Sequence, residues 1–141
     1  MYNIQVTTQD QALAHLLLHC CLKDGRFEDA EIDKVSEIFV QYGLQQELNF
    51  KDEVHKYREY FSGITDEKAF VDYLVSLIMS VNELALFSWC VELMLIDDLM
   101  SIEEEALLEK IADALNILDE EKQVINELMV QRKVVLSEKI C

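Results

Sequence analysis

The stretch LLHCCLKDGRFEDAE, residues 17–31, joins the end of an apolar helix to a second helix through a short acidic turn. Leu17 and Cys20 belong to the apolar stripe of the incoming helix. Gly25 can adopt the positive φ that a sharp turn requires. Glu31 falls in the first turn of the outgoing helix, where negative charge is favoured. The stretch therefore predicts a helix–loop–helix unit.

The same pattern returns 73 positions later, in CVELMLIDDLMSIEE, residues 90–104. Acidic, apolar and helix-ending positions correspond between the two stretches, which is harder to obtain by chance than a match of apolar positions alone. We interpret the match as an internal duplication, with repeat units at about residues 12–44 and 85–117. The matched acidic pairs are Asp24 with Asp97 and Glu31 with Glu104, and the matched helix-ending pair is Gly43 with Asn116.

The rest of the chain also favours helices. Its 141 residues include no proline and three glycines, and apolar residues recur with a helical period. The stretch 83–96 is apolar almost all round, which predicts a helix at the centre of the domain. We expect an all-α bundle of about seven helices in a single domain, residues 1–141. The expected helices cover residues 8–23, 29–42, 46–61, 66–81, 83–96, 101–115 and 119–136.

Helix ends and one pair of histidines give more specific expectations. Thr65 can cap the fourth helix, and Ser101 and Glu104 have the spacing of a capping box. His15 and His19 stand four residues apart on the first helix. Because no HExxH motif follows, we interpret them as surface histidines on a polar stripe rather than as metal ligands.

The composition restricts the classes of partner. A formal net charge of −16 repels nucleic acid and anionic membranes, and it favours cations and basic protein surfaces. No uninterrupted apolar run of ~18 residues predicts a membrane span. The start of the chain lacks the features of a secretory signal, and the four cysteines have no CxxC spacing. We therefore expect a cytoplasmic protein with reduced thiols.

The acidic turns are candidate cation sites. Carboxylates that face each other across a turn are hard oxygen donors, which suit Ca²⁺ or Mg²⁺. The first turn matches the later half of an EF-hand loop, but apolar residues stand where the first two ligands belong, so it is not an EF-hand. The alternative is that these acids only cap the loop and the helix. The candidate metal ligands are Asp24, Glu31, Asp97, Asp98 and Glu104.

These residues resemble the signature of the TerB-like family, which includes the tellurite-resistance TerB domain. The resemblance rests on KDGRF, residues 23–27, with Glu31, and on SIEEE, residues 101–105. It covers about residues 8–136. It implies a bundle of about seven helices with pseudo-symmetric halves, divalent-cation binding by acidic loops, a role as an interaction module, and a link to tellurite or metal stress. The second turn departs from the pattern, because Asp98 stands where glycine is expected.

Catalytic signatures are missing from the sequence. It contains no nucleophile elbow, phosphate loop or dinucleotide fingerprint. We therefore expect a non-enzymatic cytoplasmic TerB-like module that binds divalent cations and docks a partner protein. The alternative is a metal-free scaffold that acts through an apolar groove or by self-association. A carboxylate-based metalloenzyme is the third hypothesis and ranks well behind the other two.

Overall fold

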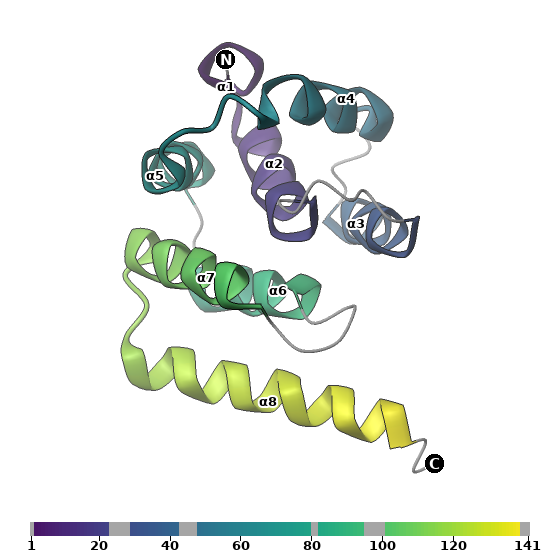
Figure 1. Cartoon of the computed structure of the whole chain (residues 1–141), viewed down its shortest axis with the longest axis vertical. Coiled ribbons are helices and arrows are strands. Elements are labelled where there is room, and N and C mark those ends of the chain that lie inside the picture. The colour runs from purple at the N-terminus through teal and green to yellow at the C-terminus, as the bar shows by residue number, and fades with distance from the viewer. Residues whose placement is uncertain (1, 23–28, 43–47, 80–81, 95–100, 139–141) are drawn as a thin grey trace. The chain divides into compact units, whose positions relative to one another are not determined.

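The computed structural model describes residues 2–22, 29–42, 48–79, 82–94 and 101–138. Within these ranges the chain forms eight helices and no strand (Figure 1), which confirms the predicted all-α fold class. The helices are α1 (Tyr2–Gln5), α2 (Gln9–Leu22), α3 (Asp29–Tyr42), α4 (Phe50–Phe61), α5 (Glu67–Ile78), α6 (Glu83–Met94), α7 (Ile102–Leu115) and α8 (Asp119–Glu138). The packing divides the chain into two compact units, Met1–Met79 and Ser80–Cys141.

Helix α2 is the central element of the first unit. It packs against α3, α4 and α5, which surround it in Figure 1. Every residue from Ala14 to Leu22 is buried, including both histidines. A helix that is covered on all sides has no solvent face to mark it as amphipathic, and its polar residues must find partners inside the unit.

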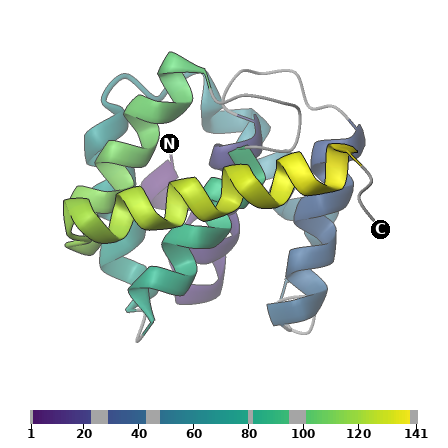
Figure 2. The ribbon, with the colours of Figure 1, turned by 90° about the horizontal axis from the view of Figure 1, so that it is seen from below.

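In the second unit, α6 takes the corresponding place. It packs against α7 and against α8, the long helix that crosses in front of α6 in Figure 2. Phe87, Cys90 and Val91 are fully buried on α6. The apolar residues of 83–94 therefore pack against both α7 and α8, which explains why α6 is apolar on nearly all sides.

The short α1 helix was not expected from the sequence. The ring of Tyr2 lies edge-on to Phe70 and Tyr73, with centroid distances of 4.9 and 5.5 Å. The Tyr73 hydroxyl also donates a 2.6 Å hydrogen bond to the carbonyl of Val6. Edge-to-face ring pairs are favourable, so these contacts fix the N-terminal segment against α5. Four residues are too few to show a helical period.

The helix caps agree with the sequence-based predictions in the second unit, whereas the cap of α5 in the first unit differs from its prediction. Ser101 and Glu104 form the predicted capping box, and Asn116 ends α7 with φ 58° in the left-handed region. Thr65 was expected to cap α5, but Asp66 takes that position, and its side chain accepts a hydrogen bond from the Ala69 backbone N–H. Aspartate is at least as good an N-cap residue as threonine.

The helix bounds agree with the proposed repeat. A shift of 73 residues carries α3, Asp29–Tyr42, onto α7, Ile102–Leu115, and each helix packs against the one before its acidic turn. Buried Val35 then corresponds to buried Leu108. This is the arrangement that a duplicated helix–loop–helix predicts. The duplication and the single-domain organisation themselves stay predictions.

Candidate functional site

Two histidines one turn apart on α2 lie in the interior of the first unit. His15 is 0% exposed and His19 is 2% exposed, so the expectation of surface histidines was wrong. The polar stripe on which they lie is covered by α4 and α5. Those helices supply hydroxyl and carboxylate partners that lie at least 38 positions further along the chain.

His15 connects a tyrosine and a glutamate that both belong to α4. Its Nδ1 lies 2.5 Å from the Tyr60 hydroxyl, and its Nε2 lies 2.8 Å from Oε1 of Glu53. An ionised carboxylate can only accept, so Nε2 carries a hydrogen and donates to Glu53. In the neutral imidazole, Nδ1 then accepts the hydrogen of the Tyr60 hydroxyl. The Tyr60 ring also stacks on the imidazole, at a centroid distance of 5.6 Å.

His19 repeats this arrangement one helical turn later. Its Nδ1 lies 2.8 Å from the Tyr57 hydroxyl, and its Nε2 lies 2.8 Å from Oε2 of Glu67, at the start of α5. Residues three or four apart share one helix face, so the two histidines of α2 face the two tyrosines of α4. The two Tyr–His–Glu sets together link α2, α4 and α5.

Glu53 carries a charge in the interior of the unit. Its side chain is 3% exposed, and Oε2 lies 3.3 Å from Nζ of Lys56. Burial raises the pKa of Glu53, but hydrogen bonds from His15 and Lys56 and the electrostatic interactions with these two residues outweigh burial, so the pKa is lowered overall. The carboxylate is therefore ionised at neutral pH.

Tyr60 is held in the opposite state. Burial raises the pKa of its hydroxyl, and the nearby negative charge of Glu53 raises it further. The phenol therefore keeps its hydrogen at neutral pH. This state agrees with a hydrogen bond in which Tyr60 donates to His15 and His15 donates to Glu53.

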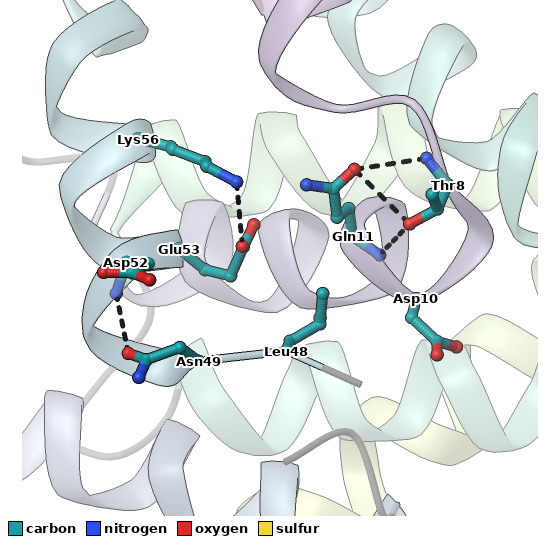
Figure 3. Close-up of a pocket in the computed structure, with 8 residues that line it drawn as sticks. All are labelled: Thr8, Asp10, Gln11, Leu48, Asn49, Asp52, Glu53 and Lys56. Atoms are coloured by element: carbon teal, nitrogen blue, oxygen red, sulfur yellow. Dashed lines mark hydrogen bonds and ion pairs between the residues drawn. The ribbon is translucent and has the colours of Figure 1, made fainter. Parts of the chain in front are cut away.

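The Glu53 carboxylate also forms part of the wall of a surface pocket of about 530 Å³ (Figure 3). Three carboxylates and one ammonium line this pocket, together with amide and hydroxyl groups. The hydrogen-bonded chain that starts at buried Tyr60 thus ends at a polar hollow open to solvent. The lining residues are Thr8, Asp10, Gln11, Leu48, Asn49, Asp52, Glu53 and Lys56.

The predicted metal ligands mostly lie outside the described structure. Asp24, Asp97 and Asp98 are not among the described residues, and Glu31 lies in α3 but its side chain is not described. Glu104 is described, and its Oε1 accepts a 3.0 Å hydrogen bond from the Ser101 backbone N–H. In the described part of the chain, no three His, Cys, Asp or Glu side chains are grouped to hold a metal.

The sequence contained a signal for the buried histidines. His15 and His19 stand among apolar residues, with Leu16–Leu18 between them and Cys20–Leu22 after them. The helix that contains them carries almost no charge. A histidine among so many apolar neighbours is expected to be buried with partners on both ring nitrogens. The partners themselves could not be read, because no local spacing connects α2 to residues of α4 and α5.

No family model, curated protein or solved structure matches this chain. The TerB-like resemblance therefore rests on the residues of the two acidic turns alone. Across the ranges that the structure describes, no helix combines the length and the apolar character that crossing a membrane requires.

Proposed function

We propose that this protein is a non-enzymatic, cytoplasmic TerB-like module whose acidic turns bind divalent cations in a tellurite or metal-stress response. The supporting observation concerns the helices on either side of the two acidic turns. Each turn connects two helices that pack on each other, α2 with α3 and α6 with α7. Packed flanking helices hold the described ends of each acidic stretch, which lowers the cost of bringing its carboxylates together around an ion.

The chemistry of the turns suits hard cations. Asp24 and Glu31 supply carboxylates in the first turn, and Asp97, Asp98 and Glu104 supply them in the second. Water and backbone carbonyls can complete the six to eight oxygen ligands that Ca²⁺ takes. The capping bond of Glu104 uses only part of its acceptor capacity, since a carboxylate has about four lone-pair sites. The net charge of −16 also raises the local concentration of cations.

Thermal melting with and without divalent cations tests this proposal. With chelator present and then with millimolar Ca²⁺ or Mg²⁺, we expect the wild type to melt higher with the ion. Binding to the native state alone stabilises by about 2.7 kcal/mol at a hundredfold excess over Kd. Asp24→Asn should lose the shift. Asp113→Asn, which removes an equal charge from an exposed position of α7, should keep it.

The control variant separates binding from screening of the negative surface. If the wild type melts alike with and without the ions at matched ionic strength, the cation proposal is wrong. If Asp24→Asn and Asp113→Asn lose the shift to the same extent, the ions act through net charge and not through the turn.

A metal-free scaffold remains the second candidate, and α8 carries the observation that favours it. Val124 and Leu128 lie one turn apart on α8 and are 54% and 52% exposed, so they form a small apolar stripe. Self-association through this stripe predicts that the molecular mass measured by sedimentation rises with protein concentration. The double variant Val124→Ser/Leu128→Ser should keep the monomer mass at every concentration. A concentration-independent monomer mass would contradict self-association.

A further inference from the structure

The surface pocket contains an amide whose orientation is fixed. Oε1 of Gln11 accepts hydrogen bonds of 3.1–3.4 Å from the backbone N–H groups and hydroxyls of Thr7 and Thr8. The Gln11 nitrogen, Nε2, must therefore lie on the opposite side. Figure 3 shows it pointing toward Lys56 and Glu53. No described residue accepts a hydrogen bond from it.

Two further donors line the same pocket. The Oδ1 atom of Asn49 accepts a 3.1 Å hydrogen bond from the Asp52 backbone N–H at the start of α4, which leaves its Nδ2 as a donor. Lys56 has three ammonium hydrogens, and its 3.3 Å hydrogen bond to Oε2 of Glu53 uses one of them. The pocket thus offers these donors together with the carboxylates of Asp10, Asp52 and Glu53, and Figure 3 shows Glu53 between Lys56 and Gln11.

The charges of the lining restrict the class of ligand. A simple anion would face three carboxylates and one ammonium, in a chain of net charge −16. A simple cation would face the ammonium of Lys56 and leave the two amide nitrogens without acceptors. A molecule that carries both an ammonium and a carboxylate can pair with each set at once.

We propose that this pocket binds a free α-amino acid. The ligand carboxylate accepts hydrogen bonds from Gln11 Nε2 and from Lys56, and the ligand ammonium donates to the carboxylates of the lining. A volume of about 530 Å³ falls within the usual range of small-molecule sites. This binding is separate from the proposed cation binding, because no residue of the acidic turns lines the pocket.

Protein-observed NMR with defined probes tests the proposal. L-alanine, L-serine, L-glutamine and L-leucine are titrated to ~10 mM, which covers Kd values into the millimolar range. We expect at least one to give saturable shifts of the Gln11 and Asn49 side-chain amides. Ethylamine and propionate, which are alanine without its carboxylate or its ammonium, should bind at least about tenfold more weakly, since each leaves a charge unpaired. Glycerol tests whether any hydroxylated molecule suffices.

Several results would overturn the proposal. These are no saturable shift with any of the four amino acids, or equal binding of ethylamine, propionate or glycerol. Gln11→Glu keeps the capping oxygen but replaces the donor with an acceptor, so we expect an affinity loss of about tenfold or more. Gln131→Glu, at an exposed position of α8, is the matched control and should bind normally.

A second variant covers the case in which Gln11→Glu perturbs the fold. Lys56→Met removes the ammonium but keeps the length of the side chain, and it should weaken the amino acid more than it weakens ethylamine. Far-UV circular dichroism checks that both variants remain helical. Normal amino-acid binding by both folded variants would show that these donors are not the site.

Discussion

Replacing His15 with alanine should lower the free energy of unfolding by about 2–5 kcal/mol, because two buried polar groups each lose a hydrogen-bond partner at a cost of about 1–3 kcal/mol. The imidazole is 0% exposed and bonds to Glu53 and Tyr60 at once. Its loss leaves the Glu53 carboxylate with Lys56 as its remaining partner among the described residues. It also leaves the buried Tyr60 hydroxyl without its acceptor.

Urea unfolding followed by far-UV circular dichroism measures this effect. Helix content is the better signal, because the single tryptophan, Trp89, belongs to the second unit. His55→Ala is the matched control on α4. His55 also contacts a glutamate, Glu59, at 2.7 Å, but its side chain is 73% exposed, and exposed pairs contribute about 0–1 kcal/mol. Equal effects of the two variants would contradict a structural role for the buried set.

The pH dependence of stability should reveal the two shifted groups, beginning with Glu53. Its folded pKa lies below the ordinary value of 4.5. The stability that Glu53 contributes is therefore present above this value and is lost as the pH falls through the folded pKa. Acid also relieves the repulsion within a chain of net charge −16. The informative quantity is therefore the difference in the free energy of unfolding between the wild type and Glu53→Gln. That difference should narrow below pH 4.5.

Tyr60 should act at the alkaline end. Its folded pKa lies above the ordinary value of 10.0, so the unfolded chain loses this proton first. The contribution is fully present below pH 10 and is lost as the pH rises further. In denaturant midpoints, the stability difference between the wild type and Tyr60→Phe should therefore narrow above pH 10. A difference that stays constant across both windows would mean that neither group is shifted by folding.

Local signals in the sequence were enough to predict most helices. The predicted 29–42 agrees with α3, and 101–115 differs from α7 only by the cap residue Ser101. The capping box and the positive φ of Asn116 were predicted for the same reason, since each depends on residues within one or two turns. The acidic turns combine such local signals, but they fall outside the described residues, so their ligand set stays a prediction.

The buried site could not be predicted in this way. The spacing of His15 and His19 predicts a polar stripe, but spacing alone does not show which helices cover that stripe. Their partners come from α4 and α5, and only the packing of the first unit brings them together. The orientation of Gln11 in the pocket has the same origin. It depends on a capping interaction with Thr7 and Thr8 as well as on the position of α4.

The most direct test of the central proposal is an NMR titration that follows the glycine amides as Mg²⁺ or Ca²⁺ is added at constant ionic strength. The chain has three glycines, and of these only Gly25 lies in an acidic turn. Gly63, beyond the end of α4, serves as the internal reference. Cation binding by the turn predicts that the Gly25 amide shifts and saturates while Gly63 stays in place. A Gly25 amide that does not move, or that drifts together with Gly63 without saturating, would contradict cation binding at the first turn.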